Sequence, residues 1–244
     1  MNPKPFSFVV RSMQLKFASF NIHKAVGLDR RRDPDRILSV LHELDADVIA
    51  LQECDRRFGR RESVLPRARI EDSPYRPIAL SIRPGSLGWH GNTFLLKKEI
   101  SVVETDPLIL PTLEPRGAVR VDIEHGGKRV RAIGMHLDLS GFRRRHQAEA
   151  VLAHLDDCKH DCPTVVMGDT NEWSSTGGML RLFRDRWHSP DCGPSFPTRR
   201  PIARLDRIFA SHQWDMVDSG VHHSLLASRA SDHLPVWATL SLKS

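Results

Sequence analysis

The chain has 244 residues, of which 27% are charged and 40% hydrophobic, a composition that fits one globular domain able to bury its own core. Its 36 Lys and Arg exceed its 30 Asp and Glu, and the formal net charge of +6 excludes an acidic solvating protein and favours anionic partners without choosing a function. No segment approaches the roughly 18 apolar residues of a membrane span and the start lacks a signal-peptide core, so we expect a cytoplasmic protein with its four cysteines reduced.

Regular hydrophobic patterning begins at Gln14. We therefore expect residues 1–13 to be a flexible N-terminal arm, with Met13 as an alternative start, and residues 14–244 to form a single domain. We find no repeat and no linker, and we expect a monomer.

The first half of the domain reads as a strand, a helix and a second strand. Residues 15–20 predict a strand that ends at Asn21. Asp33 is a plausible N-cap, and the proline after it suits the first helical position of a helix whose apolar residues recur at helical spacing. The apolar run 47–53 then predicts a buried strand ending at Glu53.

Later strands are short and separated by turns. The pair Gly126-Gly127 is a hairpin signal, and residues 143–157 predict a helix with one apolar face. Such a mixture of hairpins and strand–helix units predicts an α/β (α+β) fold in which two sheets pack together. The strands expected in this part of the chain are 93–96, 100–103, 118–123, 130–135, 164–169, 205–210 and 237–242.

Polar side chains stand at the ends of these apolar strands, where loops held by a rigid scaffold usually carry function. Each such residue alone is equally typical of a turn, a cap or a salt bridge, but the ordered set is unusual. Its members are Asn21, Glu53, His136, Asp138, Asp169, Asn171, Asp206, Asp232 and His233.

The ordered set resembles the endonuclease/exonuclease/phosphatase superfamily. The matching motifs are Asn21, Gln52-Glu53, His136, Gly168-Asp169-Thr170-Asn171, Asp206 and Ser231-Asp232-His233-Leu234-Pro235, and they cover residues 15–242. The family usually has Phe where this chain has Thr170. Within the family the chain looks most like small bacterial stand-alone members, which carry NIHK (21–24), PRGA (115–118), NEW (171–173) and RLDRI (204–208). The resemblance implies a DNase I-like four-layer sandwich of two packed mixed β-sheets flanked by helices.

The resemblance also implies a metal-dependent phosphoesterase, and more specifically a phosphodiesterase. Mg²⁺ or Mn²⁺ is the expected cofactor because the acids and amides of the set are hard oxygen ligands and no thiolate belongs to it. Glu53 is the best single candidate ligand, with Asn21 beside it and Asp232 at the same or a second metal position. Asp232 is also expected to fix the ring of the neighbouring His233.

The remaining set residues receive catalytic roles. Asp169 is the candidate general base, which aligns or deprotonates the attacking water. Asn171 is expected to donate to a phosphate oxygen and to orient Asp169. His136 and His233 are expected to stabilise charge on the phosphoryl oxygens, and Asp206 resembles the family residue that orients the central histidine.

Arginines cluster on the loops that leave these strand ends, which predicts a basic rim around the site. Arg116, Arg144 and Trp173 are the candidate substrate contacts; Trp173 suits stacking on a base or covering a lipid head group, and also packing under its loop. Nucleic acid is the slightly favoured substrate, the alternative is a phospholipid, phosphoinositide or sphingomyelin-type head group, and a non-catalytic binding module is disfavoured. The clusters are Arg30, Arg31, Arg32 and Arg36; Arg56, Arg57, Arg60 and Arg61; Arg143, Arg144 and Arg145; and Arg199, Arg200, Arg204 and Arg207.

Overall fold

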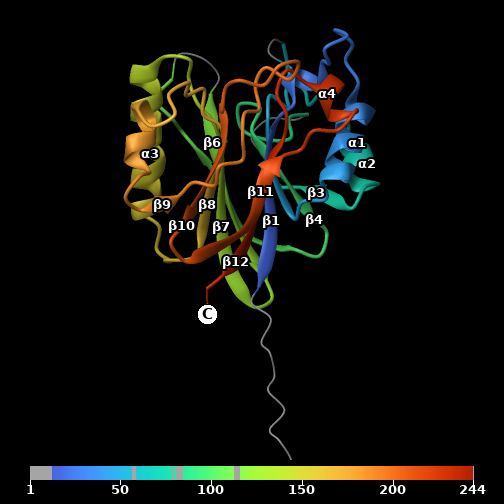
Figure 1. The fold of residues 1–244 in the computed structure, drawn as a ribbon. Helices are drawn as coiled ribbons and strands as arrows, with labels where there is room; N and C mark the ends of the chain where they lie inside the picture. The colour runs from blue at the N-terminus through green and yellow to red at the C-terminus, as the bar shows by residue number, and fades with distance from the viewer. Residues whose placement is uncertain (1–12, 57–58, 79, 81–84, 113–115, 244) are drawn as a thin grey trace, which may run out of the picture.

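The computed structural model describes residues 13–56, 59–78, 80, 85–112 and 116–243. Within these residues the chain forms two six-stranded mixed sheets packed face to face, with helices on both outer sides (Figure 1). The two packed sheets confirm the fold class expected from the strand and helix patterns, and the layers are those that the family resemblance implies. The expected arm 1–13 lies outside the described residues except for Met13, whose carbonyl accepts a hydrogen bond from Leu242 N.

The first sheet has the spatial strand order β11-β12-β1-β2-β4-β3. Its central pair β1 and β2 is parallel, and its other neighbours are antiparallel. The strands are β1 (Gln14–Asn21), β2 (Val48–Gln52), β3 (Tyr75–Pro77), β4 (Thr93–Lys97), β11 (Trp214–Val221) and β12 (Val236–Leu242).

The second sheet has the order β5-β6-β7-β8-β10-β9, and here β7 and β8 are the parallel pair. Gly126 and Gly127 connect β6 to β7 with positive φ angles of 57° and 72°, which confirms the predicted hairpin. The strands are β5 (Ser101–Leu108), β6 (Gly117–His125), β7 (Lys128–His136), β8 (Thr164–Asp169), β9 (Trp187–His188) and β10 (Asp206–Ser211).

Helices cover the two outer faces. α1, α2 and α4 lie on the first sheet, and α3 lies on the second (Figure 1). Asp33 caps α1 as predicted, since its Oδ1 accepts a hydrogen bond from Arg36 N at 3.0 Å. Among the described residues no helix is long and apolar enough to cross a bilayer. The helices are α1 (Pro34–Leu44), α2 (Arg67–Glu71), α3 (Gly141–Asp156) and α4 (Ala227–Ala230), with 3-10 turns η1 (His23–Ala25) and η2 (Gly178–Leu182).

The main apolar core lies between the sheets. Phe17, Phe94 and Val121 belong to it, and all three are fully buried. Separate apolar clusters join each sheet to its helices, so the outer faces are covered except at the exposed edge strands β5 and β11. This packing makes both sheets rigid supports for the loops at their ends.

The sheet pairings bring the chemistry-bearing strand ends to one edge of the sandwich. Asn21 pairs with Gln52 at the ends of β1 and β2, and Asp169 pairs with both His136 and Asp206. Gly168 is required at this point, because a Cβ there, with φ of 152°, would lie 1.9 Å from the Met135 carbonyl oxygen. The close approach of β7 to β8 therefore depends on this glycine.

Candidate active site

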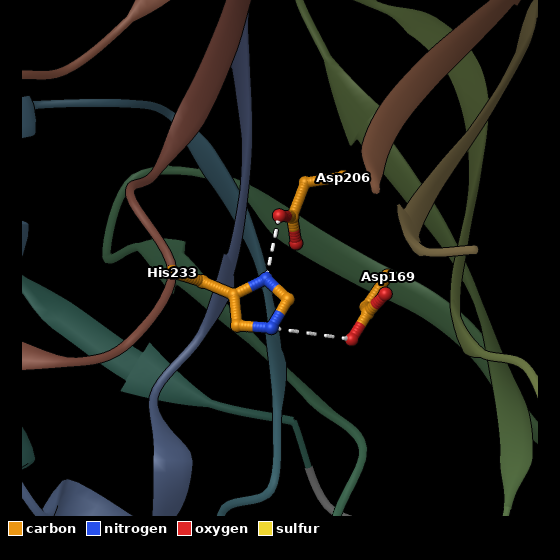
Figure 2. A group of neighbouring side chains, drawn as sticks. All are labelled: Asp169, Asp206 and His233. Carbon is orange, nitrogen blue, oxygen red and sulfur yellow. Dashed lines mark hydrogen bonds and ion pairs between the residues drawn. The ribbon is translucent and has the colours of Figure 1, made fainter. Parts of the chain in front are cut away.

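A buried imidazole links two carboxylates at the shared edge of the sheets. His233 Nδ1 lies 2.7 Å from Asp206 Oδ2, and its Nε2 lies 3.8 Å from Asp169 Oδ2 (Figure 2). Asp206 and Asp169 come from the paired ends of β10 and β8, whereas His233 comes from the loop before β12 in the other sheet. The arrangement therefore spans both sheets.

Asp169 is the point at which the polar side chains converge. Its Oδ2 accepts a hydrogen bond from Asn21 Nδ2 at 3.0 Å and lies 3.3 Å from His136 Nε2. Its Oδ1 accepts from the backbone N of Asn171 at 3.0 Å. All four residues are buried, so these contacts hold the Asp169 carboxylate in one orientation.

The carboxylates and imidazoles of this buried cluster stabilise one another's charged forms. Burial by itself would raise the pKa of Asp169, but the imidazoles of His233 and His136 hold it well below its usual range. Burial by itself would lower the pKa of His233, but Asp206 and Asp169 raise it to about 10. Asp169 is thus an anion and His233 a cation at neutral pH.

Glu53 stands at the end of β2 with a left-handed backbone, φ 57°, which turns it out of the strand. Its carboxylate contacts the ammonium of Lys24, so a cation already lies against it. Burial would raise the pKa of Glu53, but His136, Lys24 and Arg116 lower it. The residue is therefore an anion in a strongly basic setting.

Asn21 ends β1, and Glu53 and Asp232 lie on segments that adjoin β2 and β12 of the same sheet. Lys24 N donates to the Glu53 carbonyl, which places the segment after Asn21 beside Glu53, and Ser231 Oγ donates to the Asn21 carbonyl at 2.7 Å. Asp232 Oδ1 lies 3.8 Å from His23 Nδ1. The expectation that Asp232 fixes the His233 ring is wrong, because Asp206 makes the contact with Nδ1.

The donor set fits a hard divalent cation. Glu53, Asp232 and the amide of Asn21 offer oxygen atoms, and Asp206 Oδ1 is a buried oxygen without a hydrogen-bond partner among the described residues. Ligand atoms of Asp169, Asp206 and His233 also lie within 4.8 Å of one another. Both groups already hold an internal cation, Lys24 against Glu53 and His233 against the two aspartates. We favour the Glu53 side for the metal because its donors are all oxygen atoms, whereas the second group includes an imidazole.

Two of the three expected substrate contacts lie at the site. The guanidinium of Arg116 contacts the ring of His136. Trp173 is 62% exposed and meets Phe196 edge-on at 6.2 Å, and Phe196 packs against His233 at 4.7 Å between ring centroids. Trp173 therefore stands at the solvent end of an aromatic path to His233.

Arg144 does not fit the expected role. It is 8% exposed, its Nη1 donates to the Leu139 carbonyl at 2.6 Å, and its Nε pairs with the buried Glu172 at 3.4 Å. Its guanidinium therefore bonds to groups of the protein itself and does not point to substrate. Spacing could have revealed this, because Arg144 shares the buried stripe of α3 with Ala148 and Val151 at i, i+4 and i+7.

The basic rim is also smaller than its sequence suggests. Arg36 pairs with Asp29 and Asp33, Arg204 pairs with Asp191, and Arg207 donates to the Ser174 carbonyl. Arg57 and the Pro115 of the PRGA motif lie outside the described residues. The exposed arginines that remain on these loops include Arg30, Arg31, Arg56, Arg60, Arg199 and Arg200.

Sequence reasoning gave no role to three residues that touch the site. Lys24 contacts Glu53, Ser195 Oγ donates to Asp206 Oδ2 at 2.6 Å, and Phe196 packs on His233. Lys24 belongs to the NIHK motif, which was a usable signal. Ser195 and Phe196 lie in an irregular segment, and only the fold brings them to the site.

The family model of the Endonuclease/Exonuclease/phosphatase family matches residues 18–233. No curated protein matches the sequence.

Several solved structures share the fold. An endonuclease/exonuclease/phosphatase from Beutenbergia cavernae DSM 12333 is 24% identical, with a TM-score of 0.72 over 96% of this chain and 72% of that one. D. rerio TDP2 complexed with single strand DNA product is 18% identical, with a TM-score of 0.71 over 93% and 99%. The human Nocturnin catalytic domain with bound sulfate anion is 17% identical, with a TM-score of 0.72 over 94% and 95%.

Proposed function

The chain belongs to the endonuclease/exonuclease/phosphatase family, and on that premise we propose that it is a divalent-metal-dependent phosphodiesterase. The observation that carries the proposal is the convergence on Asp169. Side chains from both sheets, Asn21 and His233 from one and His136 from the other, meet its buried Oδ2 within 3.8 Å. A non-catalytic module has no need of such a buried, charged and fully oriented group.

Hydrolysis forms a bond between a water oxygen and phosphorus and breaks the bond from phosphorus to the ester oxygen; the water's proton passes late in the attack to Asp169, and the leaving oxygen takes a proton from solvent. Asp169 orients the attacking water; its lowered pKa makes it better suited to alignment than to taking a proton early. His233 and His136 donate N–H groups to the phosphoryl oxygens. Asp206 keeps the His233 ring in place through Nδ1.

Other residues bind and orient the phosphate. Asn171 lies beside Asp169 and Arg116 beside His136, where both can meet phosphate oxygens. Glu53, Asn21 and Asp232 are the residues that would hold Mg²⁺ or Mn²⁺. When bound, the ion supplies charge neutralisation for the phosphodiester.

Two substrate classes fit this site. Nucleic acid is supported by the exposed arginines on the loops and by a structural neighbour, D. rerio TDP2, whose structure contains a single strand DNA product. A phospholipid head group is supported by exposed apolar side chains on the same loops, including Trp173. Both classes place an anionic phosphodiester against the same polar group.

A panel assay tests the proposal. The wild-type chain, stripped of metal and then given Mg²⁺ or Mn²⁺, is assayed on bis-p-nitrophenyl phosphate, duplex DNA, abasic DNA, RNA, phosphoinositides and sphingomyelin. We expect metal-dependent turnover of at least one diester. Asp169→Ala should abolish it, because this change removes the residue on which the site converges.

The matched control is Asp191→Ala. Asp191 is an exposed aspartate that pairs with Arg204 at 2.9 Å, and its loss should leave turnover within twofold of wild type. Turnover that persists without metal, or in Asp169→Ala, contradicts the mechanism.

A further inference from the structure

Large apolar side chains are most exposed at one end of the molecule. Six of them are more than 60% exposed, and each lies on a segment next to a strand end that carries or adjoins the site. We call them the apolar tips: Ile109 (84%), Leu139 (65%), Phe142 (74%), Trp173 (62%), Ile202 (68%) and Leu225 (86%).

The topology explains why the apolar tips share an end. Ile109 follows β5 where Leu108 pairs with Ala118, one position from the pairing of Gly117 with His136. The other five follow β7, β8 and β11 or precede β10, and those strand ends carry or adjoin the site. The loops concerned are drawn together at the top of the sandwich (Figure 1).

The rest of the described surface differs. Its other exposed large apolar side chains range from 37% for Val102 to 51% for Val217, and all but Leu226 lie on the edge strands β5 and β11. Single exposed apolar residues are normal on a monomer, but their concentration at one functional end marks an interaction surface.

Among the described residues, the exposed charged side chains that lack an opposite partner next to the apolar tips are arginines. Of the acids on these segments, Asp138 and Glu172 are buried, the exposed Asp191 pairs with Arg204, and Asp232 lies 3.8 Å from His23. Arg143, Arg199 and Arg200 stand next to the apolar tips, and none of these side chains has an acidic partner within the part of the chain that the structure describes. The surface therefore combines exposed apolar side chains with arginines that attract anions.

From this combination we propose that the apolar tips dock the protein on an anionic lipid bilayer, with the active site facing the lipid. The docking itself does not depend on the proposed phosphodiesterase function; only the hydrolysis of a lipid phosphodiester after docking rests on it. Four of the six apolar tips are aliphatic, and aliphatic side chains cannot stack along a nucleic acid strand. A bilayer interface accepts aliphatic and aromatic side chains together and places its phosphates level with flanking arginines.

Vesicle co-sedimentation of the full chain tests the docking. Vesicles of phosphatidylcholine with phosphatidylglycerol should bind the protein, and vesicles of phosphatidylcholine alone should bind it less. The double variant Leu139→Ser/Phe142→Ser should lose about tenfold in affinity for each side chain that inserts. Arg199→Gln/Arg200→Gln should lose about fivefold for each arginine, and only on the anionic vesicles.

The control pair is Val103→Ser/Val217→Ser, which removes exposed apolar side chains from the edge strands and should change vesicle affinity less than threefold. Absence of wild-type binding to the anionic vesicles, or equal loss in both pairs, overturns the proposal. So does a loss by the Leu139/Phe142 variant that appears with a single-stranded oligonucleotide and not with vesicles.

Turnover of bis-p-nitrophenyl phosphate without vesicles separates this proposal from the proposed function. Vesicle binding without turnover leaves the docking standing and rejects the phosphodiesterase. Turnover without vesicle binding supports the phosphodiesterase and rejects the docking.

Discussion

Replacing Asp206 by Asn tests how the site works. Asp206 is buried and acts through the His233 ring, whose Nδ1 is 2.7 Å from its Oδ2. Asn keeps the shape, and its amide oxygen can still accept from Ser195 Oγ. The change therefore removes the negative charge while leaving the packing in place.

The size of the effect follows from burial. The side chain of Asp206 is fully buried and that of His233 is 7% exposed, so water does not replace the lost negative charge. A hydrogen bond to a charged group is worth about 1.5–3 kcal/mol. If that contact is fully maintained in the transition state, kcat should fall by about 10- to 150-fold.

Steady-state hydrolysis of bis-p-nitrophenyl phosphate with saturating Mg²⁺ measures this. We expect the loss in kcat, with KM within about threefold of wild type, because Asp206 positions a group and does not bind substrate. Asp191→Asn, at an exposed aspartate in the same segment of the chain, is the control and should keep wild-type kcat. A folded Asp206→Asn protein with kcat within twofold of wild type would refute the reasoning.

Three further predictions concern metal binding, the inter-sheet core and acid stability. Glu53→Gln should weaken Mg²⁺ activation at least tenfold, because it removes the charge of the favoured ligand; a metal titration of turnover checks this, and an unchanged midpoint contradicts it. Phe94→Ala should lower the free energy of unfolding by about 3–5 kcal/mol in urea, whereas Val103→Ala on an edge strand should change it by less than 1 kcal/mol. Asp122→Ala should cost about 3–5 kcal/mol because it leaves the buried Arg131 without its carboxylate partner. Burial would raise the pKa of Asp122, but Arg131 and Arg129 lower it, so its stabilisation is complete above the unfolded pKa of about 4 and is lost as the pH falls through the lower folded value. The difference in urea stability between wild type and variant should therefore begin to shrink below about pH 4, and a difference that stays constant as the pH falls further contradicts this.

Local sequence patterns predicted those elements whose residues are consistent with their own neighbourhood. The strand 164–169 agrees with β8, and the Asp33 cap with its helical spacing placed α1 correctly, because capping and periodicity act within one turn or strand. β11 escaped prediction because Trp214–Val221 holds two aspartates and a glycine, which are poor strand formers. It forms a strand because its backbone pairs with the antiparallel strand β12.

The substrate contacts show the same limit. Arg143, Arg144 and Arg145 are consecutive and alike in sequence, yet Arg144 is buried against Glu172 while Arg145 is exposed and pairs with Glu149. A run of like charges does not say which side chain faces inward, because that depends on how the helix is rotated on its sheet. For the same reason the sequence does not decide whether Trp173 stacks on substrate or packs under its loop.

The sequence by itself determined which chemistry-bearing residues stand at strand ends and in what order, because motif and strand are both local. Only the tertiary structure decided which of them act on one another. His233 has an aspartate beside it in the chain, yet its Nδ1 contacts Asp206, 27 residues away. The cause is sheet pairing: β8 and β10 set Asp206 opposite Asp169, and packing of the two sheets places His233 between them. Adjacent side chains on an extended segment point to opposite sides, so sequence proximity is a poor guide to contact.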